Sequence, residues 1–154
     1  MSQHVTKLQK EITQLINRAR DLNVTKVHGA NAAHFRSSMG HLKSLADLAV
    51  KEEAVEKLQI MIDELYPYAN NGKSFTVVTN MEAAYHSRMY KTAYSRLAVL
   101  GSHSDLTAAD LKQLYVYRHR LYVFAIFADI PAMEQLMMDI DAFRKQVKET
   151  EHVG

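Results

Sequence analysis

LYVYRHRLYVFAIFA, the stretch from Leu114 to Ala128, decides the fold of this chain. Apolar side chains occupy nearly every side of a helix formed by these residues. A helix that is hydrophobic all round is normally central and buried. The stretch therefore predicts a helix around which the other helices of an all-α domain pack.

A charged triplet, Arg118-His119-Arg120, is set inside this apolar stretch. Charges on a buried helix must find partners, reach water along their stems or meet another molecule. On a helical wheel the main apolar stripe consists of Leu114, Tyr117, Leu121, Phe124 and Ala128. Arg118 lies at the margin of that stripe, and we expect His119 and Arg120 to point outward from other faces of the helix.

A second apolar face is expected on the same helix. Val116 and Val123 lie on the side opposite the main stripe, with Tyr115 close by. Two arrangements account for such a helix: it is sandwiched within one chain, or a second subunit covers its outer face. The sequence leaves both open.

Apolar residues at helical spacing predict about six helices in all. The five others are expected at residues 2–22, 32–50, from a break at 51–53 to 66, 79–100, and from 131 onward. The first helix carries a stripe typical of a bundle, although it also permits a short coiled coil with a second copy. Gly40, inside the second helix, predicts a close helix–helix contact.

Helix ends are marked by several local signals. Thr79 with Glu82, and Thr107 with Asp110, give the Thr-x-x-acid pattern of a helix start. Pro67 predicts that the third helix ends at Tyr66, because the residue before proline avoids the helical conformation. Residues 67–78, which include Asn70-Asn71-Gly72, are expected to form a connecting loop or hinge.

The two halves of the chain resemble each other. AVEKLQIMIDEL from Ala54 and AMEQLMMDIDAF from Ala132 lie 78 residues apart and share several residues. Formal charge runs +4, −3, +4 and −3 over residues 1–50, 51–72, 73–120 and 121–154. The chain is therefore expected to be a single domain, 1–154, with possible sub-units 1–66 and 79–150 that are related three-helix units. Chance similarity between amphipathic helices is the alternative.

Composition argues against most catalytic and metal chemistry. Cysteine is absent, which excludes disulfides and thiolate ligands. Neither a nucleophile elbow nor a Gly-rich phosphate loop is present, and the histidines do not follow a strong metal-binding pattern. The longest apolar run is too short to span a bilayer. We therefore expect a cytoplasmic protein that is not an enzyme, uses no cofactor or metal, and has no membrane or small-molecule partner.

Binding of another macromolecule is the function that the sequence favours. The expected partner is another protein, a second copy of the chain, or both, with a dimer formed through the first or fifth helix. The chain would then be an adaptor, regulator or assembly factor. The alternative is a nucleic-acid-binding protein, because basic and aromatic residues interleave in the fourth and fifth helices. The candidate binding residues are Arg88, Lys91, Arg96, Tyr115, Val116, Arg118, His119, Arg120 and Val123.

Overall fold

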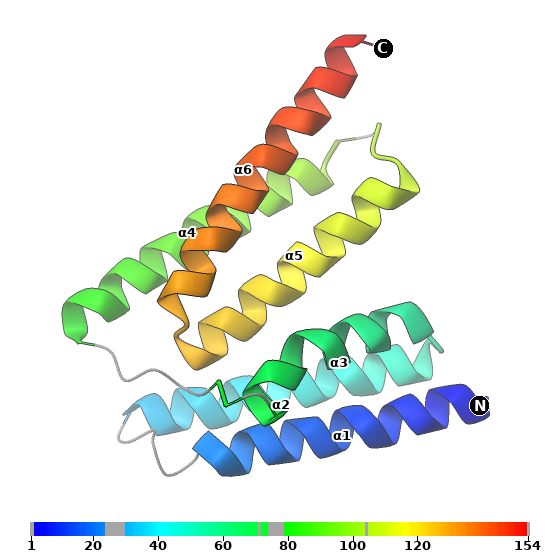
Figure 1. Ribbon diagram of the computed structural model, residues 1–154, viewed down its shortest axis with the longest axis vertical. Helices are drawn as coiled ribbons and strands as arrows, with labels where there is room; N and C mark the ends of the chain where they lie inside the picture. Colours follow the sequence, from blue (N-terminus) through cyan, green and yellow to red (C-terminus); the bar gives the residue numbers. More distant parts are fainter. Residues whose placement is uncertain (1, 24–29, 71, 74–78, 104, 154) are drawn as a thin grey trace. The chain divides into compact units, whose positions relative to one another are not determined.

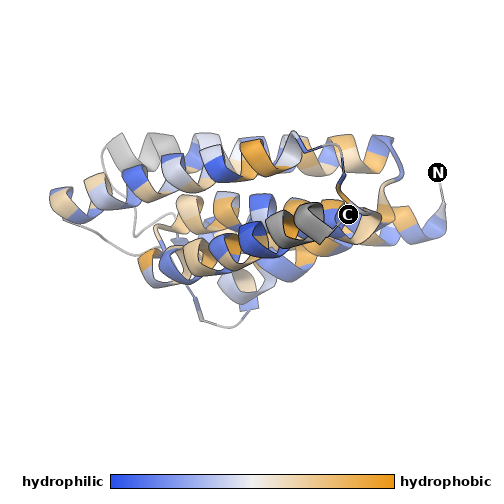
Figure 2. Cartoon of the chain, turned by 90° about the horizontal axis from the view of Figure 1, so that it is seen from above, coloured by the Kyte–Doolittle hydropathy of each residue, from blue (hydrophilic) through white to orange (hydrophobic). Residues whose placement is uncertain are grey.

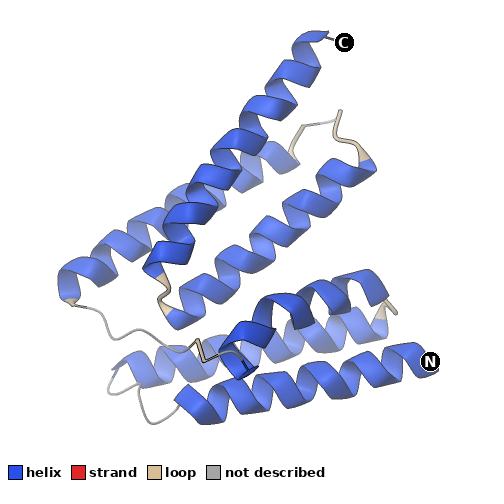
Figure 3. Ribbon diagram, in the orientation of Figure 1, coloured by secondary structure: helices blue, strands red, loops and turns tan. Residues whose placement is uncertain are grey.

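The computed structural model describes residues 2–23, 30–70, 72–73, 79–103 and 105–153 (Figure 1). These residues form six helices and no strand, so the predicted all-α fold is confirmed (Figure 3). The helices are α1 (Gln3–Asn23), α2 (Ala30–Lys51), α3 (Val55–Asn70), α4 (Asn80–Gly101), α5 (Ala108–Phe127) and α6 (Ile130–Val153). Hydrophobic and hydrophilic residues alternate along them, as expected of helices with one face toward a core (Figure 2).

The chain divides into two compact units, Met1–Val77 and Val78–Gly154. The first unit contains α1, α2 and α3, which all contact one another. The second unit contains α4, α5 and α6, which do the same. Each unit is therefore a three-helix bundle.

In the first unit, the apolar stripe predicted for α1 is buried. The buried residues of this stripe include Val5, Leu8, Ile12, Leu15 and Ala19. Because α1 contacts both α2 and α3, the bundle interpretation of this helix is confirmed. A coiled coil of α1 with a second copy would require this core to open.

The turn between α2 and α3 is a Schellman motif, the usual hydrogen-bonded end of a helix. The N–H of Ala54 donates to the carbonyl of Ala49 at 2.9 Å, and the N–H of Glu53 donates to Val50 at 3.0 Å. Glu53 takes the left-handed conformation that this motif requires, with φ of 52°. The predicted break at 51–53 is thus confirmed, and α3 begins at Val55.

The turn between α5 and α6 repeats this geometry. The N–H of Asp129 donates to the carbonyl of Phe124 at 3.0 Å, and Ala128 has φ of 52°. Glu53 and Ala128 are 75 residues apart, so the two turns are equivalent at a spacing of 75 and not 78. This spacing pairs the buried residues of α3 with buried residues of α6: Leu58 with Met133, Met61 with Leu136, Leu65 with Ile140, and Tyr68 with Phe143.

The predicted end of the third helix is wrong. Helix α3 continues through Pro67 to Asn70. Proline inside a helix removes one backbone hydrogen bond and costs roughly 3 kcal/mol. Tyr68 and Ala69 are nevertheless buried, and packing of these two side chains holds the last turn in place. Of the predicted connecting loop, residues 67–70 are helical, and residues 71 and 74–78 lie outside the described part of the chain.

The expectation for Gly40 is also wrong. A Cβ atom built on Gly40 would have no atom within 4 Å, so no neighbouring helix approaches it closely. Gly101 shows the opposite behaviour. A Cβ atom there would lie 2.6 Å from Nη2 of Arg118 and 3.3 Å from Cδ2 of Leu114. Gly101 therefore leaves room at the end of α4 for the side chains of Arg118 and Leu114.

In the second unit, capping boxes start two of the three helices. The Thr79 hydroxyl accepts from the N–H of Glu82, whose carboxylate accepts from the N–H of Thr79. Thr107 and Asp110 make the same pair of bonds at the start of α5. Both predicted starts are confirmed. The shared core includes Met89, Ala93, Leu97, Leu100, Leu114, Leu121, Met133, Leu136, Ile140, Phe143 and Val147.

Candidate functional site

The solvent-facing side of α4 carries large apolar residues. Met81 is 82% exposed and Val99 is 62% exposed. They belong to a stripe with alternating four- and three-residue spacing that also includes Tyr85, Arg88, Thr92 and Ser95, all exposed. This spacing places the side chains on one face of the helix, roughly 120° around the helix axis from the core residue Ala93.

Helix α6 lies beside this stripe. The Tyr85 hydroxyl donates to the Glu134 carboxylate at 3.2 Å, and Arg96 contacts Asp141 farther along. The two helices therefore run in the same direction. Met138, which is 65% exposed, lies between these two contacts on the same face of α6. We call Met81, Tyr85, Arg88, Val99 and Met138 together the α4–α6 surface.

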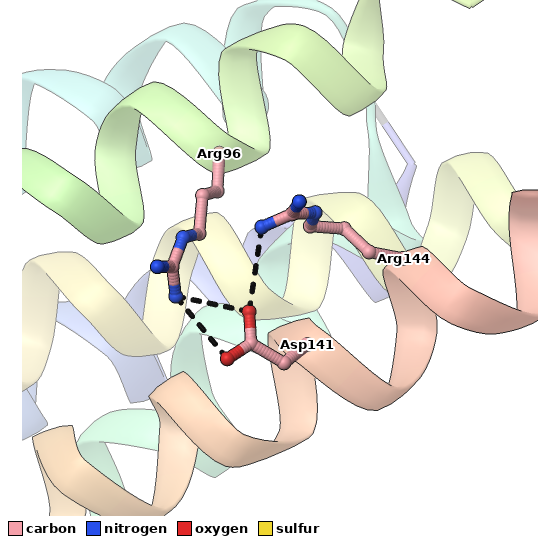
Figure 4. Close-up of polar contacts among 3 residues, drawn as sticks. All are labelled: Arg96, Asp141 and Arg144. Atoms are coloured by element: carbon pink, nitrogen blue, oxygen red, sulfur yellow. Dashed lines mark hydrogen bonds and ion pairs between the residues drawn. The ribbon is translucent and has the colours of Figure 1, made fainter.

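One end of the α4–α6 surface is fixed by a small ionic cluster (Figure 4). Nη1 of Arg96 donates to both carboxylate oxygens of Asp141, at 2.9 and 3.2 Å. Nη1 of Arg144, one turn along α6, lies 3.5 Å from Oδ1 of the same carboxylate. The side chains are only partly buried, so solvent screens the pairs and each contributes less than about 1 kcal/mol to stability. The cluster thus places the two guanidinium groups beside one shared carboxylate.

A pocket of about 210 Å³ lies beside this cluster. Leu100, which is buried, and Val99 supply its apolar surface. Its lining residues are Ser95, Arg96, Val99, Leu100, His103 and Arg144. The pocket therefore combines two guanidinium groups with a patch of aliphatic carbon.

The other flank of α4 is aromatic and basic. Tyr94 is 61% exposed, and its ring stacks on that of Tyr90 with the centroids 6.2 Å apart. Lys91, one turn from Tyr94, is exposed. Tyr90 is half-buried, and this burial raises the pKa of its phenol, whereas the Tyr94 ring is exposed.

The structure does not gather all of the predicted binding residues. Arg88 is in the α4–α6 surface, and Arg96 borders it in the ionic cluster. Lys91 lies on the aromatic flank of α4. The remaining candidates, Tyr115, Val116, Arg118, His119, Arg120 and Val123, belong to α5.

The charged triplet of α5 is divided among three environments. Arg118 is exposed, with its guanidinium close to Gly101. Arg120 is half-buried, with its guanidinium 6.0 Å from the Tyr117 ring centroid. His119 is buried, so the expectation that it points outward is wrong.

His119 is buried because it lies on the second apolar face of α5. The helical spacing places it on the same side as Val116 and Val123. Its ring stacks on Tyr115 with the centroids 6.4 Å apart, and Nε2 has no hydrogen-bond partner among the described residues. Desolvation lowers the pKa of His119 to about 4, so the ring is neutral at pH 7.

The second apolar face of α5 is a buried face in the structure. Val123 and Phe127 are completely buried, and Val116 is half-buried. The core that joins α4, α5 and α6 is formed by the opposite side of the helix, around Leu114 and Leu121. The predicted two-faced character of this helix is therefore confirmed.

Sequence reasoning missed Met81 and Val99. The four- and three-residue spacing of the stripe on α4 was a usable signal. Apolar residue type alone predicts burial, however, and only the packed bundle reveals which apolar residues remain outside the core. The Arg96–Asp141 contact joins residues 45 positions apart, and neither residue type nor local spacing predicts it.

The described residues show neither a metal-binding cluster nor a membrane-spanning helix. No group of three or more His, Asp or Glu side chains there is arranged to hold a metal ion. None of the helices there combines the length and the apolar character needed to cross a membrane.

Comparison with models of protein families, with curated protein sequences and with solved structures found no match to this chain.

Proposed function

We propose that this chain binds another protein through the α4–α6 surface, as an adaptor, regulator or assembly factor. The observation that carries the proposal is the exposure of Met81, Val99 and Met138 along two adjacent helices. Large apolar side chains left in water along one face of a helix pair are candidates for an interaction site. Methionine suits such a site because its flexible, polarizable side chain adapts to a partner.

The proposed partner is an amphipathic helix. The stripe on α4 has the alternating four- and three-residue spacing with which helices pack in bundles. A helix laid along α4 and α6 would cover Met81, Met138 and Val99 in succession and would add a fourth helix to the bundle. Arg88, exposed within the stripe, favours acidic residues on that helix.

The test is capture of partners from the native host by the wild-type chain and by two matched variants. Met138→Asp places a charge in the α4–α6 surface, and Leu111→Asp places the same charge at another exposed apolar residue of the second unit. We expect Met138→Asp to lose a partner that wild type and Leu111→Asp retain. Equal capture by all three folded proteins would contradict the proposal.

Light scattering on the purified chain separates two kinds of protein partner. A concentration-dependent dimer that is abolished by Met138→Asp would identify the partner as a second copy of the chain. If the purified chain is a monomer, the partner of the surface is a different protein.

Single-stranded nucleic acid is a second candidate, favoured by the aromatic flank of α4. Exposed Tyr94, stacked on Tyr90 and one turn from Lys91, has the arrangement on which unpaired bases stack. Fluorescence anisotropy with a single-stranded probe tests it. Binding should weaken steeply with salt, and Tyr94→Ala should weaken it roughly tenfold, from the ~1–3 kcal/mol of a base–aromatic stack. Absence of binding at low salt would reject this candidate.

A further inference from the structure

We infer that the pocket beside Arg96 and Arg144 binds a single carboxylate group carried on a short apolar stem. The inference starts from the charge of the cluster. Two guanidinium groups share one carboxylate, Asp141, which leaves one positive charge without a counter-charge in the cluster. Both guanidinium groups line the pocket.

The hydrogen-bonding capacity of the cluster is also incompletely used. A guanidinium group has five N–H donors. Within the part of the chain that the structure describes, the contacts of Arg96 and Arg144 with Asp141 use only the Nη1 atoms. Nε and Nη2 of both residues therefore remain as donors for a second acceptor, and carboxylate is the acceptor that arginine binds with the best geometry.

The size of the pocket limits the ligand. Its volume is about 210 Å³. Cofactors and drug-sized molecules occupy pockets of about 300–1,000 Å³. One acidic side chain fits the smaller volume, with its stem against Val99 and Leu100 and its oxygens at the guanidinium groups.

The charge of the pocket favours a carboxylate over a phosphate ester. A carboxylate carries one negative charge, which equals the excess charge of the cluster. A phosphate monoester carries about −1.5 to −2 at pH 7, and would bring an uncompensated negative charge close to Asp141. The apolar lining supplied by Val99 and Leu100 suits the stem of an acidic side chain as well.

The pocket adjoins Val99 of the α4–α6 surface, so an Asp or Glu of the partner helix would supply the carboxylate. In that respect the inference rests on the proposed function. Binding of that carboxylate would fix the position of the partner helix along α4, because Arg96 and Arg144 both contact Asp141.

The test uses the full chain labelled with nitrogen-15 and three small probes: sodium butyrate, n-butanol and methyl phosphate. Butyrate has the proposed carboxylate and stem, butanol has the stem without charge, and methyl phosphate has the competing anion. Amide signals of residues 95–103 and Arg side-chain Nε–H signals are followed at constant ionic strength. We expect saturable shifts with butyrate, none with butanol, and methyl phosphate no tighter than butyrate.

Three variants locate the site. Arg144→Gln should weaken butyrate binding about tenfold, as expected from losing a hydrogen bond to a charged group. Arg144→Lys, which keeps the charge and loses the planar fork, should weaken it by less. Lys91→Gln removes one positive charge from α4 outside the pocket, and should change the affinity by less than about twofold because solvent screens distant charges.

Several results would overturn the inference. With the wild-type chain, these are shifts that rise linearly without saturation, equal responses to butyrate and butanol, or methyl phosphate binding more than tenfold tighter than butyrate. With the variants, it is equal butyrate affinity in Arg144→Gln and Lys91→Gln. Because no partner protein is present, failure of this titration is distinguishable from failure of partner capture. If only the titration fails, the apolar part of the α4–α6 surface remains the proposed binding site.

Discussion

Gly40 lies in the interior of α2, exposed and without a close neighbour. Glycine there costs helix stability because it has more conformational freedom to lose on folding than alanine. We expect Gly40→Ala to raise the free energy of unfolding by about 1 kcal/mol, measured by urea denaturation. The matched control is Gly72→Ala. Gly72 has φ of +76°, so the same substitution should destabilise the protein by roughly 1 kcal/mol.

His119 should make the fold sensitive to acid. Its pKa is lowered to about 4 by burial, from 6.5 in an exposed histidine. The unfolded chain therefore binds a proton at this residue at a higher pH than the folded chain does. The contribution of the neutral His119 ring to the free energy of unfolding is fully present above pH 6.5. It is lost as the pH falls from 6.5 toward 4.

The expected loss between pH 7.5 and pH 5 is about 2 kcal/mol from His119, measured by urea denaturation at both values. Half-buried His86 has a pKa that burial also lowers, so it adds a smaller change of the same sign. His119→Phe should reduce the pH dependence, whereas His4→Phe, at an exposed position of α1, should leave it intact. An unchanged pH dependence in His119→Phe would show that His119 is not the group responsible.

At the scale of single helices, the turn at Ala128 offers the clearest test. Ala128 occupies the left-handed position of the motif between α5 and α6, where a side chain costs roughly 1–2 kcal/mol and glycine costs little. We expect Ala128→Gly to raise the melting temperature and to add about 1 kcal/mol to the free energy of unfolding. Ala98→Gly, an exposed position inside α4, should destabilise by a similar amount. Destabilisation by both substitutions would contradict the assigned turn.

The helices themselves could be predicted from local physics. The Thr79 and Thr107 capping boxes and the apolar stripe of α1 depend on neighbours within a few residues, and the structure has them where the sequence indicates. The end of α3 could not be predicted in this way. The penalty at Pro67 is local, whereas the burial of Tyr68 that overcomes it comes from packing with distant residues. The left-handed residues were missed because Glu53 and Ala128 are not the glycines that usually mark such turns.

The candidate site was only partly predictable for the same reason. Arg88 and Lys91 were recognisable as exposed cations on an amphipathic helix. The pairing of Arg96 with Asp141 depends on how α4 and α6 pack. His119 was expected to be outward because of its polar type, although its spacing from Val116 and Val123 places it on the buried second face of α5.

At the scale of the whole molecule, two three-helix units are joined in one chain, and they share the geometry of their second turn. Their outer surfaces differ. Among the described residues, five of the nine large exposed apolar side chains lie on α4 and α6 of the second unit, whereas the first unit has three, Leu22, Leu48 and Tyr66. The proposed binding function therefore belongs to the second unit.

The most direct test of the proposed binding function is site-specific photo-crosslinking in the native host. A photoreactive amino acid replaces Met138 in one strain and Leu111 in another, since both residues are exposed on the second unit. We predict a discrete cross-linked protein from position 138 that is absent from position 111 and disappears when Val99→Asp is added. No adduct at position 138, or the same adducts at both positions, would contradict the proposal that the α4–α6 surface binds a protein.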